Sequence, residues 1–552
     1  MHARPACCHT RVTHHARQRR TLLALLLVLL VLLPLAAAQA SGRTVVYCPS
    51  TAPVALQPAL RNDVPSMEAS ARTIFDRLLE LGPDMQPQPA LARAWQVSAD
   101  GLGYTLQLRR GVHFQRNFGF VPSRDFDADD VVFSFMRMLD PKHPYHDVSG
   151  GTYTYAQSMA LPQLIRSVQA LDRDTVRFQL RRRYAPFPAV LAMEFASIGS
   201  AEYAAQLQRA GRQDEFDRKP IGTGPFQLKA QLPGSMLRYA AFAGHWRGAP
   251  GYDHLVFAVT PDSTLRWARL QRGECDIIGE PNPADLPAIR SDPRVRLLRE
   301  PGLNEGYLAF NTEHGPLRDA RVRRALVLAV NRRAIVEAVF GDEARVAYGV
   351  LPPTMWSYDA SARLPDQDLA QARRLLAAAG YARGFDTSIW TVATGQGMLR
   401  DPRRIAVMIQ ADWAALGVRA RIRSYEWGEL LARLARGEHD TTLMTWISDD
   451  GDPDNFIASQ LSCSGVHTAQ NLSEYCSASM DALFAQALET TDAGRRAALY
   501  ARAQQRFVRD VPWLPLAHVN ATYVMSRRLR GDLLTPLGGP RFDRLSPVGQ
   551  HR

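Results

Sequence analysis

Helical and strand-like segments alternate along the second half of the chain, and this alternation constrains the fold more than any other feature. The pattern predicts a helix, a strand, a helix and a strand, over residues 322–339, 386–390, 404–416 and 418–424. A further amphipathic helix is predicted over 492–509. Strands that alternate with helices are typical of α/β domains, in which helices cover the faces of a sheet. The second half is therefore predicted to form an α/β lobe.

Strands and turns are more frequent in the first half. Residues 44–48 alternate as a first strand, two alternating segments around Asp100-Gly101 predict a hairpin, and another strand is expected over 255–259. Between residues 67 and 81 the apolar spacing instead predicts a helix. The chain contains no internal repeat and no low-complexity linker.

The first forty residues have the features of an export signal. Five arginines and no acidic residue accompany an apolar run from Leu22 to Leu35, and Ala38-Gln39-Ala40 offers small residues for cleavage. The run is shorter than the about 20 residues that a membrane-spanning helix needs, which disfavours the alternative of a retained anchor. We expect residues 1–40 to be a signal peptide and the mature protein to be exported.

The net charge gives no sign of a nucleic-acid partner. The formal charge is +12, and removing the signal takes away five positive charges. The remaining positive charge is almost all arginine, spread along the chain rather than clustered, whereas a nucleic-acid interface needs a basic patch. At 46% hydrophobic and 22% charged residues the composition is that of a globular protein, and a chain of 552 residues is expected to divide into several lobes.

Four cysteines follow the signal, and an even number in an exported chain favours disulfides. Three pairings are open. The short separation of Cys463 from Cys476 favours a local bridge, which would leave Cys48 to pair with Cys275. A zinc site is the alternative, but no CxxC pair or histidine cluster accompanies the cysteines.

One short acidic stretch stands out as a candidate site. The apolar run Leu443, Met444 and Trp446 reads as a strand, and four carboxylates then follow at positions 449, 450, 452 and 454, interrupted by turn-forming glycine and proline. A strand that ends in clustered carboxylates holds negative charge at a fixed place, so this stretch is a candidate site for binding a cationic group. Aspartates at alternate positions also suggest a calcium loop, although Asn455 and Leu461 stand where glycine and a bidentate glutamate are needed.

Motifs of the common enzyme classes are absent from the sequence. It contains no GxSxG, HExxH or P-loop, and its histidines lack ligand spacing. Catalysis is therefore disfavoured, and we expect neither a cofactor nor a metal.

Several segments in order resemble the large extracytoplasmic solute-binding proteins of ABC importers, which include oligopeptide, dipeptide and nickel binders. The resemblance covers essentially the whole mature chain and is strongest with dipeptide-binding and SapA-type peptide-binding members. The segments that carry it are Ala94–Phe114, Phe126–Phe135, His143–Gly151, Ile221–Phe226, Gly302–Asn311, Val322–Leu326, Leu351–Trp356 and Tyr425–Glu429.

This resemblance implies a two-lobed periplasmic-binding-protein fold of type II, with an additional inserted domain. Lobe I would comprise residues 41–75, 216–302 and 520–552, the inserted domain residues 76–215, and lobe II residues 303–519. The protein would be periplasmic and monomeric, would bind short peptides by lobe closure, and would deliver them to a membrane permease.

In family members, a ligand-binding aspartate follows the tryptophan of the strand that precedes the acidic stretch. By this resemblance, the role falls on Asp449. An ammonium group enclosed between lobes loses its hydration and needs a carboxylate. The alternative is that Asp449 caps a turn or faces solvent. Trp446 is our candidate for an aromatic wall, whereas Trp356, Trp390 and Trp427 are expected to be core residues.

The sequence offers no equally clear residue to bind the ligand's carboxylate group. Relatives have an arginine where ungapped alignment from Trp390 places Gln396, and an amide lacks the charge and bidentate geometry of guanidinium. Arg400 or Arg61 could take the role, although abundant arginines are mostly solvated. The alternatives to dipeptide binding are therefore a SapA-like binder of antimicrobial peptides or another ligand, a nickel binder, and, from a different class, an exported hydrolase.

Overall fold

The computed structural model describes residues 43–394, 399–535 and 537–549. The expected signal peptide and Gln396 lie outside these residues. From Val45 onward the chain forms one compact unit, which is the part considered below. Within the described ranges, every helix is too short or too polar to span a bilayer.

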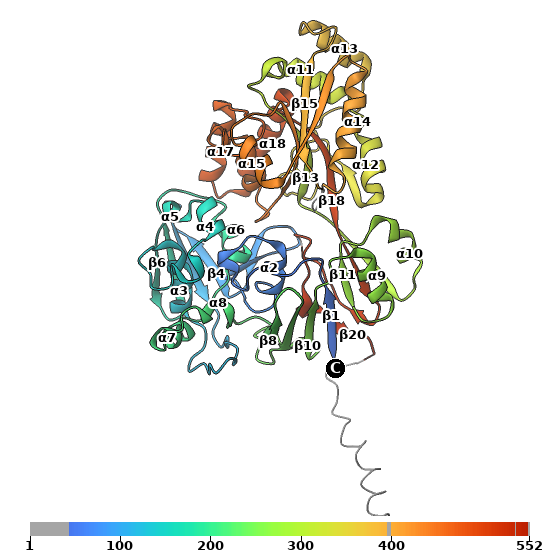
Figure 1. The fold of residues 1–552 in the computed structure, drawn as a ribbon. Coiled ribbons are helices and arrows are strands. Elements are labelled where there is room, and N and C mark those ends of the chain that lie inside the picture. The colour runs from blue at the N-terminus through green and yellow to red at the C-terminus, as the bar shows by residue number, and fades with distance from the viewer. Residues whose placement is uncertain (1–42, 395–398, 536, 550–552) are drawn as a thin grey trace, which may run out of the picture. The chain divides into compact units, whose positions relative to one another are not determined.

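The first large sheet gathers strands from the N-terminal third and from the C-terminus. In space β8 lies at one edge, followed by β9, β10, β1, β11 and the far half of β18 (Figure 1). Their bounds are Phe226–Leu232 for β8, Met236–Ala241 for β9, His254–Ala258 for β10, Thr44–Cys48 for β1, Ile277–Gly279 for β11 and Trp513–Ser526 for β18.

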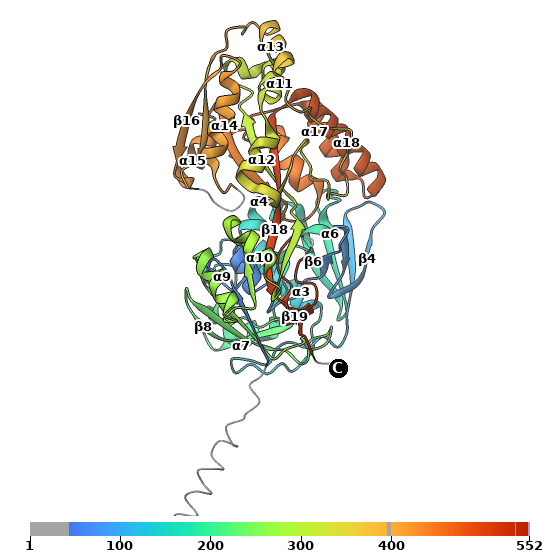
Figure 2. The same cartoon turned by 90° about the vertical axis from the view of Figure 1, so that its right-hand side faces the viewer.

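The second large sheet is built mainly from the second half, in the order β16-β15-β17-β13-β18. β15 pairs in parallel with β16 and β17, as strands joined by helical crossovers do. Helix α14 packs on β15 and β16 (Figure 2). The bounds are Asn304–Phe310 for β13, Asp386–Val392 for β15, Arg419–Tyr425 for β16, Thr441–Ile447 for β17, Ala320–Ala329 for α11, Arg332–Phe340 for α12 and Pro402–Ala414 for α14. This is the α/β arrangement that the alternating pattern predicts.

Two chain segments pass from one sheet to the other. The long strand β18 pairs with β13 through its first half and with β11 and β12 (Val295–Pro301) through its second. The second passage joins β12 to β13. Between them the Asn304 side chain donates to the Val519 carbonyl at 2.7 Å and accepts from the Val519 amide at 2.8 Å, which ties the two passages together. His518 is buried beside them, and burial lowers its pKa to about 4.

A third, four-stranded sheet has the order β4-β5-β7-β6 and carries helix α3 on one face. β4 (Ala92–Val97) and β5 (Gly103–Leu108) form the hairpin expected around Asp100-Gly101. β6 covers Ile165–Asp172, β7 Thr175–Leu180 and α3 Ala128–Leu139. Its apolar core draws on residues between 59 and 221, separately from the core of the second sheet, which draws almost entirely on residues 303–519.

The helix expected over 67–81 is wrong. Helix α2 covers Val64–Ala69, and the segment then turns and enters the short strand β2 (Leu79–Leu81). The Ile74 carbonyl accepts from the Gly224 amide at 2.9 Å and from the Gln115 side chain at 3.0 Å, so long-range partners take the bonds that a helix would use. Apolar spacing alone could not show those partners.

The helix expected over 322–339 is two helices, α11 and α12. They are separated at Val330 and Asn331, where the Asn331 side chain caps α12 by accepting from the Ala334 amide at 3.0 Å. A capping residue inside an apolar-periodic segment therefore marks a helix start that periodicity overlooks.

Both expected disulfides are present. Cys48 is bonded to Cys275, which links neighbouring strand ends in the first sheet, and Cys463 is bonded to Cys476 in the loops after the acidic stretch. The second bond closes a short loop, for which the chain-entropy model gives roughly 3 kcal/mol.

Candidate functional site

Asp449 lies two residues beyond the end of β17 and is half-buried. Its Oδ1 accepts from the Tyr155 hydroxyl at 2.9 Å, and Tyr155 belongs to the short helix α4 (Thr154–Ser158) near the third sheet. Its Oδ2 accepts a long bond from the Asn455 amide at 3.4 Å. Both partners are neutral. Burial raises the pKa of Asp449, and the bond from Tyr155 partly offsets this shift.

The other three aspartates of the stretch hold the turn together. Oδ1 of Asp450 accepts from the Asp452 amide at 2.8 Å, and Oδ1 of Asp452 accepts from the Asp454 amide at 2.9 Å. These are Asx-type turns, which suit aspartate followed by a tight bend. Gly451, between them, has φ +71°, a conformation that other residues rarely adopt.

Asp452 also forms a buried, bidentate ion pair. Arg496, on helix α18 (Ala493–Asp510), donates to its two carboxylate oxygens at 2.7 and 2.8 Å. Asp454 has no such partner among the residues that the structure describes, and burial with the neighbouring charge of Asp452 raises its pKa to about 7. Burial also raises the pKa of Asp450 well above its ordinary value. The carboxylates of Asp450 and Asp452 are thus committed to the turn and to Arg496, which does not match the donor set of a calcium loop.

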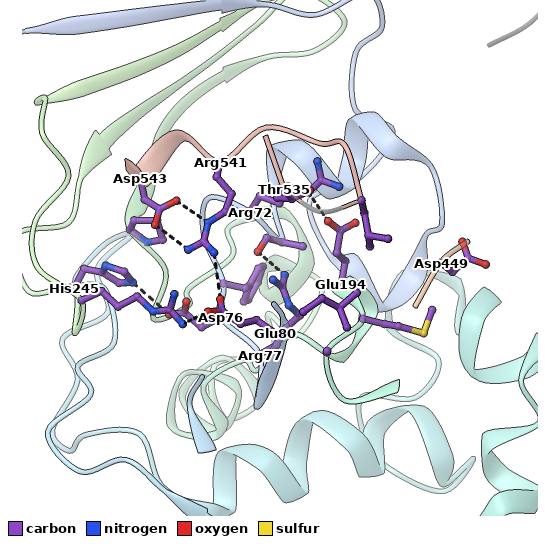
Figure 3. A pocket seen from close by; sticks show the side chains of 18 residues that line it. Arg72, Asp76, Arg77, Glu80, Glu194, His245, Asp449, Thr535, Arg541 and Asp543 are labelled. Carbon is purple, nitrogen blue, oxygen red and sulfur yellow. Dashed lines mark hydrogen bonds and ion pairs between the residues drawn. The ribbon is translucent and has the colours of Figure 1, made fainter. Parts of the chain in front are cut away.

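Asp449 lines a cavity whose walls are unusually rich in charge (Figure 3). The walls come from segments far apart in the sequence: the turn before β2, the segment around Glu194, the segment around His245, and the C-terminal residues near Arg541. The basic side chains are those of Arg72, Arg77, His245, Arg247 and Arg541, and the acidic ones those of Asp76, Glu80, Glu194, Asp449 and Asp543. A ligand here would meet both signs of charge.

Of the other candidate residues, Trp446 lies in β17 opposite Glu305 of β13 and packs against the core of the second sheet. Its buried indole Nε1 has no hydrogen-bond partner among the described residues. Glu305 is fully buried, accepts from Trp513 at 3.1 Å, and has its pKa raised well above the usual range by burial. Trp446 therefore presents a free donor next to a buried acid.

The arginine candidates are not brought together with Asp449. Arg61 is exposed and lines a different hollow with Ser149 and Asp217. Arg400 is half-buried just before α14, and its Nη1 has no hydrogen-bond partner in the described part of the chain. Gln396 lies outside the described residues.

The remaining tryptophans occupy three different environments. Trp390 is buried in the second sheet and donates to Ser388 at 3.0 Å, as a core residue does. Trp427 is exposed at the start of its helix, which contradicts the expectation of a core role. Trp356 is half-buried and lines a second hollow with Trp95, Tyr104, Asp452 and Arg496.

Sequence reasoning missed most of the charged cavity. Arg72, Arg77, Glu194 and Arg541 belong to no motif, and they meet only in the folded chain. Tyr155 lies a few residues after one of the family-like segments, which was the only signal that could have drawn attention to it.

Comparisons with known proteins agree on the class. The model of the bacterial extracellular solute-binding proteins, family 5, matches residues 86–468. The dipeptide-binding protein of Escherichia coli is 42% identical over 512 residues, which are 92% of this chain and 96% of that protein. The heme-binding protein A of Haemophilus influenzae is 41% identical over 515 residues, covering 93% and 94%.

A solved structure of a relative has the same fold as this chain. The dipeptide-binding protein of Pseudoalteromonas sp. SM9913 in complex with Met-Leu superposes with a TM-score of 0.78 at 34% identity, over 92% of this chain and 100% of that one. The chain therefore belongs to family 5 of the bacterial extracellular solute-binding proteins, and the expected two-lobed type II fold is confirmed. This family consists of solute-binding proteins rather than enzymes.

Proposed function

We propose that the protein captures short peptides outside the cytoplasm and delivers them to the membrane permease of an ABC importer. The observation that carries the proposal is Asp449, a carboxylate at the edge of the charged cavity whose hydrogen-bond partners among the described residues are neutral (Figure 3). A peptide's amino terminus supplies the missing cation. The relatives named for dipeptide binding support this choice of ligand.

Asp449 would fix the amino terminus through a charge-assisted hydrogen bond. Tyr155 donates to the same carboxylate at 2.9 Å and would hold it in position. Because Tyr155 and Asp449 belong to segments with different cores, their contact is one that lobe opening would break. Ligand binding would then favour the closed arrangement through contacts that exist only in that state.

The remaining parts of the proposal concern the whole protein. Residues 1–40 would be removed as a signal peptide, and the mature protein would act as a periplasmic monomer without enzymatic activity. Lobe I would comprise 41–75, 216–302 and 520–552, the inserted domain 76–215, and lobe II 303–519. Support for this division comes from the separate apolar cores and from the two passages at β12–β13 and β18.

Calorimetry with purified mature protein tests the ligand class. Dipeptides with a free amino terminus are expected to bind, and the same dipeptides acetylated at that terminus are expected to bind far more weakly, because they carry no cation for Asp449. Equal affinity for the acetylated and free forms would contradict the role of Asp449.

A second candidate is a binder of longer cationic peptides or of another ligand. The hollow that includes Trp95, Tyr104, Trp356 and Asp452 favours it, because aromatic and acidic groups there could receive a part of a ligand that a dipeptide lacks. The relative named heme-binding protein A shows that ligand names vary among close relatives. Parallel titrations with longer cationic peptides and with heme separate these candidates.

A further inference from the structure

Almost every cation in the charged cavity already has an acidic partner. Arg72 forms an ion pair with Glu194, and Arg247 pairs with Glu80 at 2.9 Å while its guanidinium lies over the Trp246 ring. Arg541 pairs with Asp543 at 3.1 Å and with Glu80 at 3.3 Å. The His245 imidazole lies 3.6 Å from Asp76. The three arginines and their carboxylate partners neutralise one another inside the protein.

Arg77 is the exception among the cations. Within the described ranges, the only hydrogen bond of its side chain is a long one of 3.4 Å from Nη1 to the Ala71 carbonyl. Among the described residues, its buried Nε has no hydrogen-bond partner, and no carboxylate lies within 4.0 Å of the guanidinium. Asp76, Glu80 and Glu194 attract it from farther away, but burial outweighs them and lowers the pKa of Arg77.

The backbone of Arg77 is held firmly even though its side chain is not. Arg77 forms an isolated antiparallel bridge with Ser197, and its carbonyl accepts from the Leu91 amide at 3.0 Å. The guanidinium is therefore projected from a fixed point of the cavity wall. A fixed cation with unused donors is what a bidentate carboxylate contact needs.

Asp449 is the corresponding exception among the acids. Asp76, Glu80, Glu194 and Asp543 each have a basic group within 4.0 Å, whereas Asp449 accepts only from Tyr155 and Asn455. The described cavity wall thus contains one acid and one arginine without an ion-pair partner. Both line the same cavity.

We propose that Arg77 binds the carboxylate of a zwitterionic ligand whose ammonium group is bound by Asp449. This inference rests on the proposed function and narrows it, because it selects short peptides with a free carboxyl terminus. A zwitterion supplies one anion and one cation together, and so offers a contact ion pair to both groups without changing the net charge of the cavity. Arg77 would take the role that the amide at Gln396 cannot fill.

Arg400 is the competing cation, because its Nη1 also lacks a partner in the described part of the chain. It does not line the cavity that Asp449 and Arg77 share. The two arginines belong to different apolar cores, since Arg400 adjoins α14 of the second sheet and Arg77 lies beside Leu78 of the third-sheet core. Substituting them separately therefore distinguishes the two assignments.

The test compares alanyl-alanine with alanyl-alaninamide, which differ only at the carboxyl terminus. Dissociation constants of both are measured by calorimetry for the mature wild-type protein and for Arg77→Gln, Arg77→Lys, Arg400→Gln and Arg247→Gln. Wild type is expected to favour the free acid by about tenfold or more, because a charged hydrogen bond is lost in the amide. Arg77→Gln is expected to reduce this preference to about twofold or less, and Arg77→Lys to give an intermediate value because lysine lacks the bidentate fork.

Arg247→Gln is the matched control, since Arg247 lines the same cavity but is already paired with Glu80. It is expected to change both affinities by the same factor. Melting temperatures measured alongside identify a variant that folds poorly, and the ratio of the two affinities is insensitive to a partly unfolded fraction. Arg77→Lys keeps the test decisive if Arg77→Gln does not fold.

The inference is overturned if Arg77→Gln or Arg77→Lys keeps the full wild-type preference, or if Arg400→Gln alone abolishes it. It is also overturned if the wild-type protein binds the acid and the amide equally. In all of these cases the wild-type protein still binds peptide, so the proposed function stands. Failure of the wild-type protein to bind either compound would instead contradict the proposed function.

Discussion

Asp449 and Asp452 lie three residues apart in one acidic turn, yet their surroundings differ in kind. Asp452 is buried and meets Arg496 in a bidentate ion pair within the same half of the chain. Asp449 is half-buried, borders the charged cavity, and accepts only from a hydroxyl and an amide. Asp452, which has its own counterion, stabilises the fold, whereas Asp449, which borders the cavity and has no described counterion, is available to a ligand.

The largest effect is expected when the paired aspartate is changed. Asp452→Asn leaves Arg496 buried without a counterion, which we expect to lower the free energy of unfolding by about 3–5 kcal/mol. Denaturant titration of the mature protein measures this loss. Replacing Asp449 by asparagine is the matched control, and a similar loss of stability there would remove the distinction between the two positions.

Replacing Asp454 is expected to change the free energy of unfolding by an amount that depends on pH. Its folded pKa, about 7, is raised above the ordinary value of 3.8, so its contribution to stability is fully present below about pH 4 and is lost as the pH rises through 7. Asp454→Asn removes this loss. We expect the variant to be more stable than wild type by about 2 kcal/mol at pH 8, roughly half of what the shift implies because solvent partly screens the side chain.

The same variant is expected to lie within about 0.5 kcal/mol of wild type at pH 4, where the folded Asp454 side chain is neutral and the pH is close to the ordinary pKa of 3.8. Denaturant titrations at pH 4 and pH 8 give the two differences. A gain in stability that is the same at both values would show that it comes from packing and not from titration of Asp454.

Asp449→Asn is expected to weaken peptide binding more than tenfold, about 1.4 kcal/mol or more, because the ligand's ammonium loses its charged partner. The free energy of unfolding should stay within about 0.5 kcal/mol of wild type, since burial already disfavours the charged carboxylate and asparagine can still accept from Tyr155. Calorimetry and denaturant titration on the same preparation test both parts. An unchanged dissociation constant would end the assignment of Asp449 as the ligand anchor.

Tyr155→Phe should give the smallest effect. It removes the 2.9 Å hydrogen bond to Asp449 but keeps the ring, which stacks on Phe195 at 5.5 Å between centroids. We expect affinity to fall by roughly three- to tenfold, in line with about 1 kcal/mol for one hydrogen bond. Phe195→Leu disturbs the same stack without removing the hydroxyl, and a larger loss in that variant would show that the stack matters more than the bond.

The sequence predicted the local structure well where the signal was local. Periodicity located β15, β16, α14 and α18 to within a few residues, and the short separation of Cys463 from Cys476 indicated their bond. Resemblance to a family pointed to Asp449, at the end of a strand and before a turn. The helix expected over 67–81 was wrong because the Ile74 carbonyl bonds to Gly224 and Gln115, which no local pattern reveals.

The sequence by itself determined an α/β chain of a solute-binding family, with its strands, its disulfides and an acidic turn as the candidate site. Only the tertiary structure decided which charges of that site are neutralised. Asp452 meets an arginine 44 residues away, and Asp449 meets a tyrosine 294 residues away. Among the arginines that line the charged cavity, Arg77 is the one without a described carboxylate within 4.0 Å, whereas Arg72, Arg247 and Arg541 are each paired. Ion pairing depends on separations of a few ångströms, and only the folded chain brings such distant residues within that range.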